Sequence, residues 1–270
     1  MTSPARYLRL LGTFARFGLA NEMAFRANFL VKLTVEAIWL SILLAFNTIL
    51  FSHTDDIAGW DRYRYLFFLG CHYALSGIVE TFFLENCTGF AELVRTGDLD
   101  FYLLRPIDEQ FLITSRNIDW STFPNILQGA GVMAYSLLKM QWPFDLGLLL
   151  AFLALFACGC AMTYCFLLML CSLSVWMVRN QSLMELWWLF TSLMRYPRQI
   201  FDENAWAKPV GFLFTFIVPV LLVVYVPAQT LVRTLEPGFI AGMVAATLVL
   251  IFASRAFFRR ALSSYRSASS

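Results

Sequence analysis

Histidine and lysine are scarce in this chain of 270 residues. The only histidines are His53 and His72, and the only lysines are Lys32, Lys139 and Lys208. No two cysteines are separated by the two residues that metal and redox motifs require, so we expect no metal site. The six cysteines lie in or beside apolar runs, where we expect them to pack as small hydrophobic side chains.

A phosphate-binding loop is also missing. The pattern G-x-x-x-x-G-K-[ST] places a lysine after glycines whose backbone cradles phosphates, and none of the three lysines has those glycines before it. The chain therefore cannot bind ATP by this device. We expect it to hold no catalytic residues and no cofactor, so that any ATP and Mg²⁺ would be bound by a partner protein.

Charge is low and nearly balanced. Charged residues make up 14% of the chain and the formal net charge is +2, which is too small to indicate a nucleic-acid partner. No polar stretch is long enough to form a separate soluble domain. We therefore treat residues 1–270 as a single domain.

Long apolar runs dominate what is present. Apolar residues make up 59% of the chain, which contains 27 phenylalanines, and the mean hydropathy is +0.66. A helix needs about 20 apolar residues to cross the hydrocarbon of a bilayer. The pattern predicts an all-α, multi-pass membrane protein with six transmembrane helices, at approximately Phe29–Phe51, Tyr65–Leu84, Ser121–Leu138, Leu146–Val178, Ser182–Tyr196 and Gly238–Phe258.

The N-terminal segment has a different character. Arg6, Arg9 and Arg16 fall on one stripe of a helix over residues 6–26, and bulky apolar side chains occupy the other side. Such a helix favours the headgroup plane of a membrane. We expect an interfacial helix that is not a cleavable signal; a frayed cytosolic tail is the alternative.

Residues 210–231 form a seventh apolar segment, and an odd number of membrane crossings would place the two termini on opposite sides of the membrane. Arginines gather near both ends of the chain, and the positive-inside bias favours placing both termini in the cytoplasm. Seven full spans would separate the termini. Pro219 breaks the segment in the middle, and Pro227, shortly after Tyr225, adds a second break. We therefore predict an extracellular re-entrant helical hairpin here, with a full span as the competing interpretation.

The longest polar interval, after the second span, contains a short amphipathic helix at residues 86–96. Phe90, Leu93 and Val94 can share one face while Glu92 and Arg95 stay in water. Gly97 suits the left-handed position that ends a helix. A short, amphipathic, cytoplasmic helix of this kind can bind a soluble partner. The composition is equally consistent with an interfacial loop that only joins two spans.

The run GDLDFYLLRP, from Gly97 to Pro106, resembles the cytoplasmic signature of permeases in the type-2 exporter class of ABC transporters, within the antibiotic or multidrug export subgroup. Further similarities follow in the expected order along the chain, at Arg195–Pro197, Ile200–Phe201, Phe216–Pro219 and Tyr225–Ala228.

This resemblance implies a permease of the cell's inner membrane that exports its substrate together with a second permease chain, identical or different. It also implies two copies of an ATP-hydrolysing subunit that dock on the helix between the second and third spans, which is called the coupling helix. The residues implicated in that contact, or in shaping the connection after it, are Phe90, Glu92, Leu93, Val94, Arg95, Gly97, Arg105 and Pro106.

Three acidic residues fall within predicted spans, namely Glu36, Glu80 and Glu185. Charge inside a bilayer is costly and often functional, so these residues are candidates for lining a transport pathway. A simpler account exists for Glu36, which is four residues after Lys32 and can form an ion pair with it on one helix face.

Two other classes of function remain open from the sequence. In an ion-coupled secondary transporter, the three intramembrane acids would carry protons, and a broken-helix hairpin would also be expected. In a membrane enzyme acting on lipids, acids near the interface would take part in catalysis. The available acids, Asp98, Asp100, Asp108 and Glu109, have no histidine beside them in a recognisable catalytic spacing.

Overall fold

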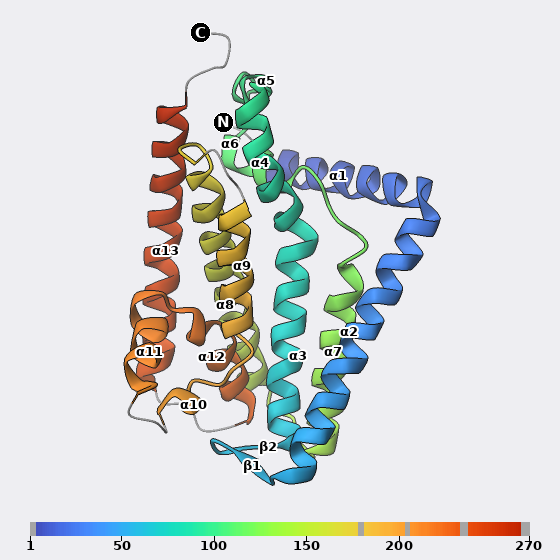
Figure 1. Ribbon diagram of the computed structural model, residues 1–270, viewed down its shortest axis with the longest axis vertical. Helices are drawn as coiled ribbons and strands as arrows, with labels where there is room; N and C mark the ends of the chain where they lie inside the picture. Colours follow the sequence, from blue (N-terminus) through green and yellow to red (C-terminus); the bar gives the residue numbers. More distant parts are fainter. Residues whose placement is uncertain (1–3, 178–180, 203–205, 233–236, 266–270) are drawn as a thin grey trace.

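A computed structural model describes residues 4–177, 181–202, 206–232 and 237–265 of the chain. It is helical, as predicted, apart from one short β-hairpin (Figure 1). The first half consists of α1 (Pro4–Ala24), α2 (Arg26–His53), β1 (Asp56–Ile57), β2 (Trp60–Asp61), α3 (Arg62–Val79), the π-helical segment η1 (Glu80–Leu84), α4 (Glu85–Thr96), α5 (Leu99–Leu103) and α6 (Glu109–Ser115). The second half consists of α7 (Phe123–Lys139), α8 (Leu146–Leu173), α9 (Gln181–Leu193), α10 (Gln199–Asp202), α11 (Lys208–Phe212), the π-helical segment η2 (Leu213–Ile217), α12 (Val220–Val232) and α13 (Pro237–Ser264).

Four helices in the described part of the chain are long and apolar enough to cross a membrane, and a fifth candidate is a bent pair. The four are α2, the continuous stretch Arg62–Thr96, α8 and α13. Helices α7 and α9 occupy the positions of the predicted third and fifth spans, but they have only 17 and 13 residues. The predicted long fourth span, Leu146–Val178, is shorter in the structure, because α8 ends at Leu173.

The N-terminal helix α1 lies across one end of the bundle, next to α4 and α6 (Figure 1). None of its residues is buried. It ends where Phe25 takes a non-helical conformation, with φ −113° and ψ 54°, and the chain turns into α2. The predicted helix over residues 6–26 is therefore present with slightly different bounds, and α13 ends at the same end of the molecule.

Helix α3 forms the centre of the bundle and is buried on nearly all sides. Its contact with α7 depends on glycine: a Cβ atom on Gly129 would lie 2.4 Å from the backbone nitrogen of Ala74, and one on Gly77 would lie 2.9 Å from that of Ile126. Such close backbone approach is typical of helix pairs in membranes. The two helices are thus fixed side by side with little room for adjustment.

The predicted coupling helix does not stand apart from the second span. Instead, α3, η1 and α4 form one continuous helical stretch of 35 residues, Arg62–Thr96. At 1.5 Å per residue this stretch is about 52 Å long, whereas the hydrocarbon of a bilayer is about 30 Å thick. The sequence predicted that the second span ends near Leu84, because the chain becomes polar at Glu85, but the helix continues through this change in polarity to Thr96.

The segment predicted to be a hairpin is bent by 85° between Lys208–Ile217 and Val220–Val232, and the break falls at Val218–Pro219 as expected. The second break, expected at Pro227, is absent, because α12 runs through Pro227. Proline at position 227 leaves the Val223 carbonyl without its helical donor. Gly159 of α8 packs directly there, since a Cβ atom on it would lie 2.5 Å from that oxygen, and this contact supports the helix where the hydrogen bond is lost.

A polar cluster fixes the hairpin region to the β-turn between α2 and α3. The indole Nε1 of Trp60 donates to Oε1 of Gln199 at 3.1 Å, and Nε2 of Gln199 donates to the Tyr225 hydroxyl at 2.8 Å. Tyr225 also packs edge-on against Phe239, with ring centroids 6.0 Å apart. Tyr225 is therefore buried in the core of this end of the bundle, opposite α4–α6 (Figure 1).

Candidate functional site

The helix predicted to contact a partner is present as α4, which ends at Thr96 with Gly97 in the left-handed conformation at φ 82°. Its apolar face, however, is turned inward. Phe90 is fully buried and packs against Phe258 of α13 with ring centroids 6.1 Å apart, and Leu93 is 9% exposed. Both side chains are buried within the chain in this conformation, so their predicted contact with a partner would require them to become exposed; that contact stays a prediction.

The outer face of α4 is polar and accessible. Glu92 and Arg95 form an ion pair with each other across one helical turn, and both are largely exposed. Val94 is half-buried against the core. Because Glu92 and Arg95 neutralise each other, the exposed face of α4 presents a paired set of charges to solvent and no unpaired charge at these two positions.

Apolar side chains project at the tip beyond Gly97. Phe101 of α5 is 66% exposed and Leu104, directly after α5, is 82% exposed. The guanidinium of Arg105 lies 5.3 Å from the ring centroid of Tyr102, and that of Arg116 lies 4.8 Å from it. These cation–π contacts hold the segment in place. We call Phe101, Leu104, Arg105 and Pro106 the α5 tip; all four are exposed at the end of the bundle where α1 lies (Figure 1).

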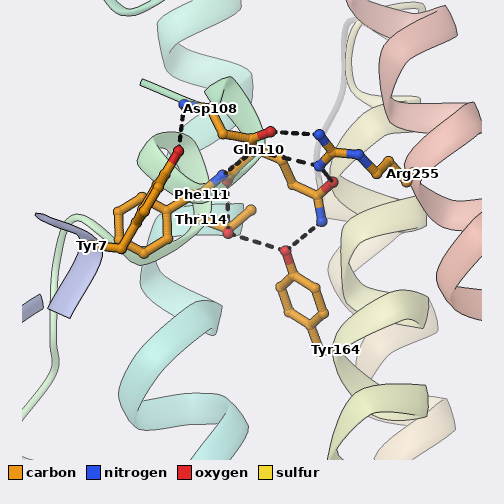
Figure 2. A network of polar contacts seen from close by, with 7 residues as sticks. All are labelled: Tyr7, Asp108, Gln110, Phe111, Thr114, Tyr164 and Arg255. Carbon is orange, nitrogen blue, oxygen red and sulfur yellow. Dashed lines mark hydrogen bonds and ion pairs between the residues drawn. The ribbon is translucent and has the colours of Figure 1, made fainter. Parts of the chain in front are cut away.

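A polar network connects the segment after the α5 tip to three other helices (Figure 2). Asp108 caps the N-terminus of α6 by accepting from the Phe111 amide at 3.1 Å, and it forms an ion pair with Arg255 of α13. Arg255 also donates to Gln110 at 2.9 Å, and Gln110 donates to the Tyr164 hydroxyl on α8 at 2.9 Å. Four residues from three helices are thus joined in one chain of contacts.

Helix α1 joins the same network. The Asp108 amide lies 3.4 Å from the Tyr7 hydroxyl, to which it donates, and the Tyr7 ring packs edge-on against Phe111 with centroids 4.7 Å apart. A cavity of about 670 Å³ lies beside these contacts, lined mainly by apolar side chains of α1, η1 and α6. The segment from Asp108 to Phe111 therefore contacts α1, α8 and α13.

The charge state of Asp108 follows from this geometry. The Arg255 guanidinium, by hydrogen bonding to the carboxylate, lowers the pKa of Asp108 below its usual value, and the capped amide of Phe111 acts in the same direction. Asp108 is therefore ionised at neutral pH. The ion pair is only partly shielded from solvent, since the side chain of Arg255 is 39% exposed.

Two of the three intramembrane acids share one cleft. Glu36 of α2 and Glu80, at the start of η1, both line a cavity of about 540 Å³ between α2, α3 and α9. Aromatic side chains, including Trp39 and Trp188, form its walls. Figure 1 shows α2 inclined away from the bundle toward its junction with α1. We call this cavity the α2–α9 cleft.

The third acid and the expected ion pair differ from the sequence-based prediction. Glu185 of α9 is exposed and is not among the residues that line the α2–α9 cleft. Lys32 does not pair with Glu36; its ammonium lies 3.4 Å from Glu22 and 3.8 Å from Asp119. The bend between α1 and α2 brings Glu22 back over Lys32, and a pattern of spacings along one helix could not reveal this contact.

Sequence reasoning missed several residues of the cleft. His72, Ser76, Asn125 and Arg195 also line it, and His72 and Asn125 are each 5% exposed. Within the described chain, His72 Nδ1, Ser76 Oγ and Asn125 Oδ1 are buried without a hydrogen-bond partner. The signal available in the sequence was the presence of polar residues within apolar runs; which of them face one cavity depends on how α3, α7 and α9 pack.

The described residues do not form the catalytic or metal sites that the acids after the second span would require. Asp108 is engaged by Arg255, while Asp98 and Glu109 are exposed at the surface. Among the described residues, no group of three or more histidine, cysteine, aspartate or glutamate side chains could hold a metal ion. Of these acids Asp108 forms a helix cap and an ion pair, and the arrangement gives no support to a lipid-modifying active site.

Comparison with known proteins gives one match. No curated protein and no solved structure is similar to the chain in these comparisons. A family model described as an ABC-2 family transporter protein matches residues 37–269, which is most of the chain and extends from within α2 to beyond the end of α13. Members of that family are membrane components that lack a nucleotide-binding domain of their own. The chain is therefore a multi-pass membrane protein that belongs to the ABC-2 transporter family.

Proposed function

We propose that the chain is the permease subunit of an ATP-driven exporter, in which two permease chains and two separate ATPase subunits work together. In this account the six spans are α2, the α3–α4 stretch, α7, α8, α9 and α13, and α1 lies in the headgroup plane. The bent pair of α11–η2 and α12 is a hairpin that enters and leaves from outside. Both termini face the cytoplasm of a cell whose inner membrane holds the protein.

The exposed α5 tip is the observation that carries this proposal. Phe101 and Leu104 are large apolar side chains at the end of the bundle that holds α1 and the end of α13 (Figure 1). Exposed apolar groups beside charged ones are typical of surfaces that dock another protein. The family match supports an ATPase as that partner, because a membrane component without its own nucleotide site depends on a separate motor.

The polar network supplies the link between that contact and the spans. Asp108 follows the α5 tip two residues after Pro106, and its ion pair with Arg255 connects α6 to α13 (Figure 2). We infer that closure of the ATPase subunits displaces the α5 tip and that α6 passes this displacement to α1, α8 and α13. The α3–α4 stretch moves with it, since α4 packs on α6 and α13.

We propose that the α2–α9 cleft is the part of the transport pathway that this chain contributes, and that a second permease chain contributes the rest. It contains the two acids, Glu36 and Glu80, that the sequence singled out, and α2 exposes an apolar face beside it. A second permease chain placed against α2 and α9 would close the cleft from the open side. The assignment to the antibiotic and multidrug subgroup rests only on the resemblance of residues Gly97–Pro106.

Replacement of both apolar side chains at the tip tests the proposal. In Phe101→Asp/Leu104→Asp, we expect the chain to insert and fold normally, whereas co-purification of the ATPase falls at least about tenfold because an apolar contact is replaced by charge. The matched control is Phe144→Asp, which alters a side chain that is 75% exposed in the connection between α7 and α8. Unchanged association in the tip variant, or equal loss in the control, would contradict the assignment.

One observation favours the ion-coupled alternative, namely that Glu36 and Glu80 share a cleft. Such a transporter would keep working after ATP depletion and stop when a protonophore collapses the proton gradient. The ABC-2 account predicts the reverse in the same cells: transport stops with ATP depletion and continues when only the proton gradient is removed.

A further inference from the structure

The polar lining of the α2–α9 cleft includes several hydrogen-bond acceptors, next to donors such as Arg195 and Ser76. Glu36 and Glu80 contribute carboxylates, and the Asn125 side chain hydrogen-bonds to Glu80 while its own carbonyl oxygen Oδ1 remains without a partner. His72 Nδ1 is also buried without a partner in the described chain. Buried polar atoms without partners are costly, so a lining of this kind is suited to a ligand that brings donors.

The net charge of the residues that line the cleft also favours a ligand that donates hydrogen bonds and carries a positive charge. Two carboxylates and one guanidinium, that of Arg195, line it, and Arg195 is the only arginine or lysine among the described residues that do so. If both acids are ionised, the lining carries one uncompensated negative charge. A ligand with a single positive charge would neutralise it, whereas an anion would be repelled.

The walls define the rest of the ligand. Trp39 and Phe46 of α2, Tyr73 of α3 and Trp188 of α9 surround the polar groups with aromatic faces. Aromatic faces attract cations and also bury apolar groups. A volume of about 540 Å³ matches the range of small-molecule sites.

We propose that the α2–α9 cleft binds a protonated lipophilic amine, whose N–H groups donate to Glu36, Glu80 and the unpartnered atoms of Asn125 and His72 while its apolar part contacts the aromatic walls. This inference rests on the proposed function, because it names the class of substrate for the same pathway. The proposed class of ligand does not include every organic cation. A quaternary ammonium carries the positive charge but has no N–H group that could donate to the acceptors of the cleft.

The test compares three ligands of equal chain length: octylammonium, octyltrimethylammonium and octanoate. Each, in radiolabelled form, is equilibrated at pH 7 with the purified full-length chain in lipid nanodiscs, and binding to empty nanodiscs is subtracted. We expect saturable binding of octylammonium, about tenfold weaker binding of the quaternary ion since its charge-assisted hydrogen bonds are lost, and no saturable binding of the anion.

Variants assign the binding to the cleft. Glu36→Gln/Glu80→Gln is expected to weaken octylammonium binding about tenfold or more, and Glu36→Gln alone provides a milder change on the exposed helix α2 in case the double variant does not fold. Glu109→Gln, an exposed acid on α6 outside the cleft, is expected to bind as the unaltered chain does.

Three results would overturn the proposal: equal affinity for the quaternary ion, unaltered binding in both Glu36 variants, or no saturable binding of octylammonium. Failure here is distinguishable from failure of the proposed function. A chain that associates with its ATPase through the α5 tip but does not bind octylammonium would refute only the class of ligand, whereas loss of the ATPase contact would refute the function itself.

Discussion

At the scale of single residues, two phenylalanines eleven positions apart have opposite environments. Phe90 is fully buried against α13, and Phe101 is 66% exposed at the α5 tip. Phe90→Ala should lower the free energy of unfolding by about 3 kcal/mol, because it removes a packed ring and leaves a cavity. Phe101→Ala should change it by less than about 0.5 kcal/mol. Denaturant unfolding of both variants in detergent measures the difference, and equal losses would contradict the assigned environments.

The ion pair between Asp108 and Arg255 makes stability depend on pH. Because the pKa of Asp108 is lowered in the folded chain, its contribution is fully present above the unfolded pKa of about 3.9 and is lost as the pH falls through the folded value. Asp108→Asn keeps a side chain that can cap α6, so it removes mainly the charge. We expect it to be less stable by about 1 kcal/mol at pH 7, a small value since solvent screens the pair, and the difference to shrink at acid pH.

The matched control for that variant is Asp145→Asn. Asp145 caps α8 by accepting from the Gly147 amide at 2.7 Å, and no ion pair with it is found in the described parts of the chain. Asp145→Asn should change the free energy of unfolding by an amount that varies less with pH than the change caused by Asp108→Asn, because no cationic side chain of the described residues pairs with Asp145. Parallel pH profiles for the two variants would show that Arg255 does not stabilise the charge on Asp108.

Some residue-level properties were accessible from the sequence and others were not. Gly97 was predicted to end a helix because its position after a short amphipathic segment requires a left-handed conformation, and it has φ 82°. The inward direction of Phe90 and Leu93 was missed. Helical periodicity shows that two residues share a face, but which neighbour covers that face depends on the distant helix α13.

At the scale of helices and their contacts, the bundle is held at points where glycine allows close packing. A Cβ atom on Gly129 of α7 would lie 2.4 Å from the backbone of α3, whereas one on Gly131 would have nothing within 4 Å. Gly129→Ala should therefore force α3 and α7 apart and lower the stability by about 2 kcal/mol. Gly131→Ala should be neutral or slightly stabilising. The same unfolding assay measures both, and a neutral Gly129→Ala would disprove the tight contact.

The two prolines of the hairpin segment show the limits of reading elements from sequence. Proline at 219 coincides with the 85° bend, whereas proline at 227 lies inside α12 without a break. Each proline lacks a backbone N–H donor, so the sequence alone predicts a helix break at both positions. The difference arises because α8 approaches α12 at Gly159, directly beside the carbonyl that Pro227 leaves free. Tertiary packing, which the local sequence does not contain, decides the outcome.

At the scale of the whole molecule, the order of apolar segments was sufficient to predict a helical, multi-pass membrane protein with a separate helix at its N-terminus. The lengths of the helices were predicted less well: α8 ends at Leu173, before the predicted end at Val178, and α9 has only 13 residues. The cleft between α2 and α9 was beyond prediction, since its lining comes from four helices that are distant in sequence. The two acids that the sequence singled out nevertheless face it.

In the proposed mechanism, an ATPase subunit would displace the α5 tip. The contacts of Asp108, Gln110, Tyr164 and Arg255 join α6 to α8 and α13 (Figure 2) and would pass this displacement to the helices and to the α2–α9 cleft. The central claim of this mechanism is that an ATPase subunit contacts the α5 tip.

Site-specific photocross-linking in living cells tests that claim most directly. A p-benzoylphenylalanine residue is introduced in place of Leu104, and a matched one in place of Phe144, which is comparably exposed in the connection between α7 and α8. Irradiation should join position 104, but not position 144, to a protein that carries a nucleotide-binding motif, identified by mass spectrometry. Cross-links from position 104 to lipid alone, or to the ATPase equally from both positions, would contradict the account.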